Sequence, residues 1–276
     1  MAKDSKIEWT HHTFNPWWGC SKVSPACQNC YAETWAKRVG KKVWGREAGR
    51  QFFGEKHWKE PIKWDKEARK EGVRRRVFCA SMADVFELRS ELNPWREKLW
   101  ELIAATPMLD WLLLTKRPQN VSRMIPWNDD QWPDNVWLGT TIENQHWADV
   151  RLPILLKHSA KVRFFSCEPL LGEIHLGEWV NKSGYHKIDW VIAGGESGPR
   201  SRPMLPSWAR SLRDQCNSSG IAFHFKQWGH WVPSELLTDS QRTVTSFGDI
   251  EMVSAGKKSA GRNLDGRTWD ELPMTG

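Results

Sequence analysis

The feature that most constrains the fold is an alternation of short apolar segments with longer amphipathic ones after residue 30. Short apolar runs are typical of strands buried on both faces, and helices between such strands favour a parallel sheet. With a first segment around Ile7–Phe14, about seven β/α units are expected. The sequence therefore predicts an α/β fold, a partial or complete TIM-like (β/α) barrel. Its other predicted strands are Val77–Ser81, Trp111–Thr115, Val136–Ile142, Val162–Ser166, Trp190–Ala193 and Ala222–Phe225.

Helices are predicted between these strands. Pro94–Ala105 follows Asn93, a residue type that caps helices, and places Pro94 at the first helical position. Pro206–Cys216 has apolar residues at helical spacing, and Ala32–Val39 follows a cysteine-containing loop.

The periodic pattern stops at Glu235, and Thr238–Gly266 is rich in Ser, Thr, Gly and charged residues. Such a composition favours turns over a second core. We therefore expect residues 1–234 to form the barrel and residues 235–276 to form a C-terminal loop or hairpin extension packed on it.

Charge and tryptophan content bear on the partner. Lys and Arg number 40 against 33 for Asp and Glu, so the net charge is +7, which suits a polyanion such as nucleic acid. The chain has 20 tryptophans, which serve either as half-buried packing residues or as stacking platforms for unpaired bases. No apolar run approaches the roughly 20 residues of a membrane span. We expect a soluble, cytoplasmic protein that makes no membrane contact.

Three cysteines form a C-x6-C-x2-C cluster near the N-terminus: Cys20, Cys27 and Cys30. Three thiolates can hold an iron–sulfur cluster and leave one iron open. Disulfides are disfavoured because the opening MAKDSKIEWT does not resemble a secretory signal. A structural zinc site stays open as an alternative, with His11, His12 or a distant cysteine as its fourth ligand. The remaining cysteines are predicted to be buried core residues: Cys79, Cys167 and Cys216.

Polar residues follow the predicted strands, where a parallel barrel carries its chemistry. Each has a structural interpretation as well. The carboxylates can form ion pairs with basic residues such as Lys116 and Arg117, and Gly194-Gly195 can be a tight turn. Lys116-Arg117 can instead have a functional role and bind a substrate phosphate. The candidates are Ser81, Asp84, Thr115, Lys116, Arg117, Glu143, Glu168, Gly194, Gly195, Glu196 and Lys226.

Several motifs together resemble the phage-associated three-Cys-motif family, which is similar to radical S-adenosylmethionine (SAM) enzymes and nearest to the spore photoproduct lyase group. The match covers almost the whole chain. It rests on Trp17–Cys20, Ser24–Tyr31, Ser81–Phe86, Leu114–Pro118, Ser166–Gly172, Gly194–Pro199, Lys226–Gly229, Gly261-Arg262 and Leu264–Arg267.

This resemblance implies a [4Fe-4S] cluster held by Cys20, Cys27 and Cys30, with SAM as the second cofactor and a 5′-deoxyadenosyl radical as the reactive species. Tyr31, directly after the last cysteine, is then expected beside the adenine. The other expected cofactor-binding residues are Ser81 and Thr115, together with Gly194, Gly195 and Glu196, which are expected from their place at a strand end and not from the position of the family's own Gly-Gly-Glu motif. The expected catalytic residues are Asp84, Lys116 and Glu168.

The expected activity is DNA lesion repair or modification of a DNA or tRNA base. An electron donor and a partner protein encoded beside the gene are expected as well. Two alternatives stay open. One is a zinc- or cluster-stabilised nucleic-acid-binding protein without catalysis; the other is metal-dependent hydrolysis by Asp84, Glu143 and Glu168.

Overall fold

The computed structural model describes residues 2–128, 130–177, 179–180, 183–198, 200–237 and 244–274. The chain forms two units. The first consists of Met1–Val23, Ala32–Thr140 and Ile154–Arg163, and the second of Ser24–Tyr31, Thr141–Pro153 and Phe164–Gly276. Pro199 of the family-like motif and residues 238–243 and 275–276 of the expected extension lie outside the described residues.

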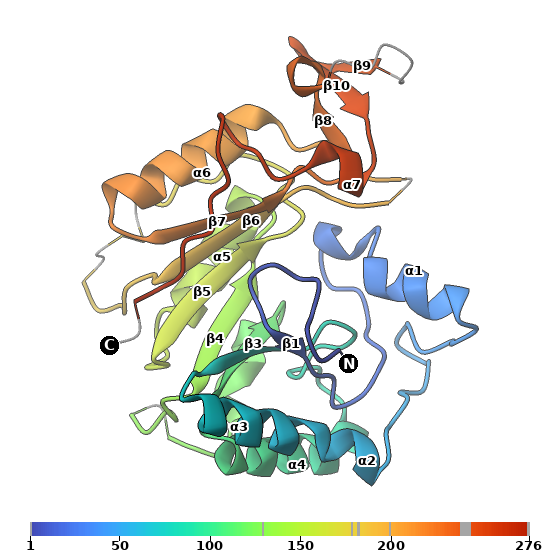
Figure 1. Ribbon diagram of the computed structural model, residues 1–276, viewed down its shortest axis with the longest axis vertical. Helices are drawn as coiled ribbons and strands as arrows, with labels where there is room; N and C mark the ends of the chain where they lie inside the picture. The colour runs from blue at the N-terminus through green and yellow to red at the C-terminus, as the bar shows by residue number, and fades with distance from the viewer. Residues whose placement is uncertain are drawn as a thin grey trace. The chain divides into compact units, whose positions relative to one another are not determined.

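The first unit is built on parallel strands that pair in sequence order: β1 (His12–Thr13), β2 (Arg75–Cys79), β3 (Leu109–Thr115) and most of β4 (Val136–Thr141). Parallel neighbours need a crossover connection, and α3 and α4 supply two of these. The helices of this unit are α1 (Tyr31–Arg38), α2 (Glu55–Trp58), α3 (Glu60–Glu71) and α4 (Asn93–Ala105), with two 3-10 turns, η2 (Ser90–Leu92) and η3 (Pro118–Arg123). Figure 1 shows α3 and α4 side by side, and α3 contacts both β2 and β3.

Strand β3 is the centre of the first unit's core. Leu109, Trp111, Leu112 and Leu113 are completely buried. A strand covered on both faces has no solvent side on which alternation would be useful, so its sequence is a continuous apolar run. That is why the strand could be predicted from the sequence.

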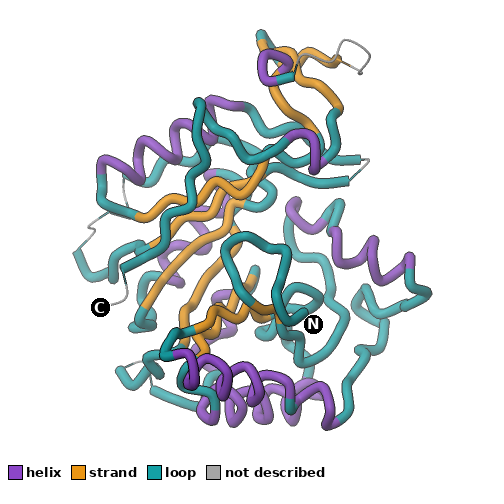
Figure 2. Tube along the Cα trace, viewed as in Figure 1, coloured by secondary structure: helices purple, strands orange, loops and turns teal. Residues whose placement is uncertain are grey.

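The second unit contains most of β5 (Val162–Cys167) and the parallel strands β6 (Trp190–Gly194) and β7 (Ala222–Gln227). Its helices are α5 (Gln145–Leu155) and α6 (Pro206–Ser218), and α6 contacts β6 and β7. A second, antiparallel sheet follows in the order β8 (Trp231–Pro233), β10 (Ile250–Ser254), β9 (Val244–Phe247), accompanied by η4 (Ser234–Leu236) and α7 (Lys257–Ala260). Figure 2 distinguishes these strands from the loops that join them.

The six strands predicted after the first segment are confirmed, each within two residues at either end. The first segment is shorter than expected, because only His12–Thr13 pairs with a neighbour. The proposed cap by Asn93 is wrong: Asn93 lies inside α4, and its side-chain oxygen accepts from Arg96 at 2.6 Å. The hairpin-like extension is confirmed by β9 and β10, although its sheet already begins at Trp231. The boundary at residue 234 stays a prediction.

None of the described helices is long and apolar enough to cross a membrane.

Candidate iron–sulfur site

Cys20 is held in the first unit by its backbone. The Gly19 N–H donates to the Met82 carbonyl at 3.0 Å, and the Cys20 carbonyl accepts from Gly45 N–H at 3.0 Å. Gly19 has φ +117°, and a Cβ there would lie 2.3 Å from the Val43 carbonyl oxygen. Only glycine fits this position, so Gly19 is what allows Cys20 to sit between the segments at Val43–Gly45 and Met82.

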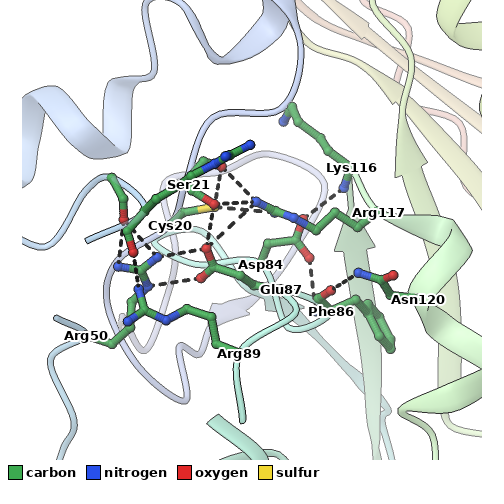
Figure 3. Close-up of polar contacts among 12 residues, drawn as sticks. Cys20, Ser21, Arg50, Asp84, Phe86, Glu87, Arg89, Lys116, Arg117 and Asn120 are labelled. Atoms are coloured by element: carbon green, nitrogen blue, oxygen red, sulfur yellow. Dashed lines mark hydrogen bonds and ion pairs between the residues drawn. The ribbon is translucent and has the colours of Figure 1, made fainter. Parts of the chain in front are cut away.

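The Cys20 thiol lies in a buried polar cluster (Figure 3). Its Sγ is 3.4 Å from the Ser21 carbonyl, to which it donates, and 3.6 Å from Nη1 of Arg117. Burial raises the pKa of the thiol to about 12, even though the Arg117 guanidinium acts in the opposite direction. The free thiol is therefore protonated, and a metal must displace the proton to bind.

Asp84 is the first of the expected catalytic residues, and both oxygens of its carboxylate already accept two hydrogen bonds each. Its carboxylate receives Thr115 Oγ1 at 2.7 Å, Arg117 Nη1 at 2.8 Å, and the main-chain N–H groups of Phe86 at 3.0 Å and Lys116 at 3.1 Å. Burial alone raises its pKa, but the charge of Arg117 and these donors lower it below its ordinary value. Asp84 is therefore ionised at neutral pH, and its carboxylate joins the segment after β2 to the end of β3.

The cluster continues to Glu87 and Arg50. The Glu87 carboxylate receives Ser21 Oγ at 2.7 Å and two nitrogens of Arg50, at 2.8 and 3.0 Å. Both side chains are almost fully buried. Buried charges are retained only when they are paired and hydrogen-bonded, which these are.

Lys116 and Ser81 are two further residues predicted at the site. Only the main-chain N–H of Lys116 contacts Asp84, and its ammonium points away from that carboxylate (Figure 3). Ser81 Oγ accepts from the Asn15 side chain at 3.1 Å, and Asn15 also accepts from the Met82 N–H at 2.7 Å. The cofactor role of Ser81 and Thr115 and the catalytic role of Lys116 stay predictions.

Cys27 and Cys30 lie in the second unit, in the segment Ser24–Tyr31, which we call the cysteine loop. Cys27 ends a 3-10 turn, η1 (Pro25–Cys27), and Cys30 directly precedes α1. Two side chains from elsewhere in the unit hold the backbone: Glu143 accepts from the Ala26 N–H at 3.2 Å, and Arg202 donates to the Pro25 carbonyl at 3.0 Å.

Glu196 holds the cysteine loop at a further point, through Asn29. Its carboxylate receives Asn29 Nδ2 at 3.0 Å and two nitrogens of the Arg202 side chain, at 2.6 and 3.0 Å. Asn29 also donates to the Arg200 carbonyl at 2.7 Å. Burial raises the pKa of Glu196, but the bonds from Arg202 and Asn29 lower it below its ordinary value. Glu196 therefore ties the cysteine loop to the strand end, a role that the sequence did not reveal.

Glu143 and Glu168, two further carboxylates at strand ends, are also paired. Glu143 forms a completely buried ion pair with Arg151 at 2.9 Å. Glu168 pairs with Lys226 at 2.8 Å. The ion-pair interpretation is confirmed for both residues; the catalytic role of Glu168 stays a prediction.

Gly194 and Gly195 have a packing reason to be glycine. A Cβ on Gly195 would lie 1.8 Å from the Trp228 carbonyl oxygen, and one on Gly194 would lie 3.0 Å from Glu168 Oε1. The Gly195 N–H is already donated to the Gln227 carbonyl at 3.0 Å. The two glycines therefore let the end of β6 approach the end of β7, and their role in SAM binding stays a prediction.

The thiols fit an iron–sulfur cluster by their chemistry. None of the six cysteines is in a disulfide: Cys20, Cys27 and Cys30 are partly exposed as whole residues, whereas Cys79, Cys167 and Cys216 are buried, as predicted for core residues. Within the described part of the chain, no three His, Cys, Asp or Glu side chains are grouped closely enough to hold a metal. Tyr31 opens α1 and is 56% exposed, and its place beside the adenine of SAM stays a prediction.

The two histidines considered as zinc ligands have structural contacts. His11 Nδ1 accepts from the Arg76 N–H at 2.8 Å, and the His12 ring stacks on Trp64 with centroids 4.5 Å apart. Arg50, Glu87, Asn29 and Arg202 were not expected at the site. One signal was available in the sequence: Gly19, directly before Cys20, indicates that another segment packs closely against the backbone there, and Arg50 is one of the residues that does so.

Comparison with known proteins adds a family and a fold. The sequence pattern of a family described as "Protein of unknown function (DUF5131)" matches residues 4–273. No curated protein matches the chain.

The similar solved structures are of spore photoproduct lyase. A cysteine-to-serine mutant has a TM-score of 0.52 at 14% identity, covering 94% of this chain and 72% of that chain. A tyrosine-to-phenylalanine mutant has a TM-score of 0.51 at 14% identity, covering 91% and 70%. A doubly substituted lyase with bound AdoMet and dinucleoside spore photoproduct has a TM-score of 0.48 at 14% identity, covering 91% and 70%.

At this identity the likeness shows the fold. It is an α/β partial (β/α) barrel with seven parallel strands in sequence order, followed by a three-stranded antiparallel sheet. The predicted fold class is confirmed.

Proposed function

The chain belongs to the DUF5131 family, and from its fold and its cysteines we propose that it is a radical SAM-type iron–sulfur enzyme acting on nucleic acid. The observation that carries the proposal is the set of three cysteines outside any disulfide, spaced C-x6-C-x2-C, in a chain with the fold of spore photoproduct lyase. Three thiolates leave one iron of a four-iron cluster open for SAM.

Cys20, Cys27 and Cys30 would hold the cluster, and Tyr31 would pack on the adenine of SAM. When bound, the cluster supplies the electron that cleaves SAM to a 5′-deoxyadenosyl radical. The rest of the chain positions the ligands. Gly19 holds the main chain at Cys20, whereas Glu143 and Glu196 hold the cysteine loop. Such supporting contacts fix a ligand's orientation before the metal arrives.

A stretch of basic residues supports nucleic acid as the substrate. It comprises residues 37–46, and we call it the basic segment. It contains five basic residues and no acidic ones, and all five are exposed: Lys37, Arg38, Lys41, Lys42 and Arg46. Trp35, on the preceding turn of α1, is 44% exposed. Cationic side chains beside an exposed indole suit a phosphate backbone with unstacked bases. Spore photoproduct lyase is named for a lesion, and repair of a DNA lesion or modification of a base is the proposed reaction class.

The test is anaerobic reconstitution with iron and sulfide, followed by electron paramagnetic resonance with and without SAM. We expect about four irons per chain, a SAM-dependent change in the spectrum, and release of 5′-deoxyadenosine under reduction. Replacing Cys20, Cys27 or Cys30 by Ala should abolish all three signals, whereas the buried Cys216→Ala serves as the matched control. Stoichiometric zinc with no iron in protein purified anaerobically would overturn the proposal.

A second candidate is a nucleic-acid-binding protein whose metal is structural. It is favoured by the saturation of Asp84 and Glu196, whose carboxylates are fully used in holding strands and loops. Nucleic-acid binding that persists without any 5′-deoxyadenosine release from iron-loaded protein would select it. The hydrolase alternative is not proposed, because Asp84, Glu143 and Glu168 are each committed to an ion pair.

A further inference from the structure

Arg117 is an unusual residue to find at the end of a buried strand. It follows Lys116 after β3, its own N–H donates to Thr115 Oγ1 at 2.9 Å, and only 6% of its surface is exposed. Burying a guanidinium is costly unless all its hydrogen-bonding groups are engaged. What this side chain binds therefore indicates why it is there.

Two of its nitrogens are occupied by groups around Cys20 (Figure 3). Nη2 donates to the carbonyl oxygen of Ser21 at 2.8 Å and to its hydroxyl at 3.0 Å. Nη1 donates to Asp84 Oδ2 at 2.8 Å and is 3.6 Å from Cys20 Sγ. The guanidinium thus binds the residue after the cysteine and reaches the sulfur itself.

Two carboxylates fix the orientation of the Arg117 guanidinium. Asp84 lies on one side, and Glu87, 3.8 Å from Nη2, is already shared with Arg50 and Ser21. A planar guanidinium held by a carboxylate and a main-chain carbonyl cannot rotate away from the sulfur, and a lysine ammonium could not make the same set of bonds.

We propose that Arg117 is a positioning residue that holds Cys20 and raises the reduction potential of the cluster bound there. This inference rests on the proposed function. Reduction adds negative charge to a cluster and its thiolates, and a hydrogen bond or cation at a ligating sulfur stabilises that added charge. Arg117 makes electron transfer into the site easier.

The experiment compares reconstituted wild-type, Arg117→Met and Arg117→Lys proteins by potentiometric titration followed by electron paramagnetic resonance. We expect Arg117→Met to disfavour reduction about tenfold, about 59 mV for a one-electron couple. Arg117→Lys keeps the positive charge but cannot make the same set of hydrogen bonds, so its reduction potential should lie between those of wild type and Arg117→Met. Arg50→Met is the matched control, because Arg50 is a buried arginine nearby that binds Glu87 and main-chain carbonyls.

The outcomes separate the two proposals. Wild-type protein that takes up no iron overturns both. Wild-type protein with a cluster, and an Arg117→Met potential equal to that of wild type, overturns the role of Arg117 alone. An equal shift in Arg50→Met also overturns it, since the effect would then be one of net charge. If Arg117→Met does not fold, Arg117→Lys decides by the same measurement. Iron lost in both Arg117 variants but kept in Arg50→Met supports the positioning role.

Discussion

At the scale of single residues, the site depends on residues whose hydrogen bonds and packing contacts are already made in the absence of a ligand. Asp84 receives four donors, and Gly19 admits a backbone contact that no other residue could make. Both act on Cys20 indirectly, Asp84 through Arg117 and Gly19 through the main chain. Replacing them should therefore affect loading and stability together.

Gly19→Ala should destabilise the chain by about 1–3 kcal/mol, the cost of a strained backbone, with a further loss from the clash at the Val43 carbonyl. The measurement is denaturant unfolding, together with iron content after reconstitution. Gly40→Ala is the matched control: φ there is also positive, at +73°, but a Cβ would meet nothing within 4 Å. Equal losses in the two variants would contradict the role of Gly19 in placing Cys20.

His11 should make stability depend on pH. Burial, with the charges of Arg76 and Arg75, lowers its pKa to about 4 in the native state, against an ordinary value of 6.5. The unfolded chain therefore binds the extra proton first, and the free energy of unfolding is greatest above pH 6.5 and falls as the pH drops towards 4. After allowance for solvent screening, the loss is about 1 kcal/mol.

The check is the free energy of unfolding at intervals from pH 7 to pH 4 in wild type and in His11→Asn. The variant keeps a side-chain acceptor for the Arg76 N–H but does not titrate, so its profile should be flatter in this range. Parallel profiles would show that His11 is not responsible.

At the scale of elements, the cysteine loop has little structure of its own and is held by other parts of the second unit. Its 3-10 turn is three residues long, and the loop depends on Glu143 from the end of β4, Glu196 from the end of β6 and Arg202 beyond it. Surface loops keep a fixed form only where their backbone groups find such partners.

Glu196→Ala should loosen this loop and lower the iron content several-fold under limiting iron. The loss of hydrogen bonds to a charged group should cost about 1.5–3 kcal/mol of stability. Iron content and thermal unfolding measure the two effects. Glu235→Ala, in the same unit but with a side chain that is 69% exposed, is the control and should leave both unchanged. Full loading of Glu196→Ala would show that the loop does not need this anchor.

The basic segment is the second element with a proposed function, the binding of nucleic acid. Lys41→Glu with Lys42→Glu should weaken binding of single-stranded DNA and make the slope of log affinity against log salt shallower by about 1.4, or about 0.7 per lost phosphate contact. Fluorescence anisotropy over a range of salt concentrations measures this slope. Lys66→Glu with Lys70→Glu, on exposed positions of α3, applies the same charge change elsewhere. Equal effects of the two pairs would mean that net charge alone matters.

At the scale of the whole molecule, the seven parallel strands and their crossovers belong to a fold that is shared with spore photoproduct lyase and that hosts chemistry at strand ends. A fold does not carry a reaction with it; the side chains at the site decide that. Here those side chains are thiols, arginines and carboxylates that are already paired.

Cluster loading should stabilise the whole chain, because a group that binds only the native state shifts unfolding by mass action. We expect the melting temperature of reconstituted protein to exceed that of metal-free protein, and chelation to return it to the metal-free value. Cys20→Ala should show no increase on reconstitution. A rise in Cys20→Ala equal to that of wild type would place the stabilising metal elsewhere.

The sequence by itself determined the strands, the three-cysteine pattern and the buried state of the other cysteines. These follow from local properties: continuous apolar runs for doubly covered strands, and short spacings for the thiols. Only the tertiary structure decided what the polar strand ends do. Arg117 reaches Cys20 across 97 positions of the chain, and Arg202 reaches Pro25 across 177. Nothing local to either residue encodes such a pairing, because the partner of a buried charge is chosen by the topology that brings the two together.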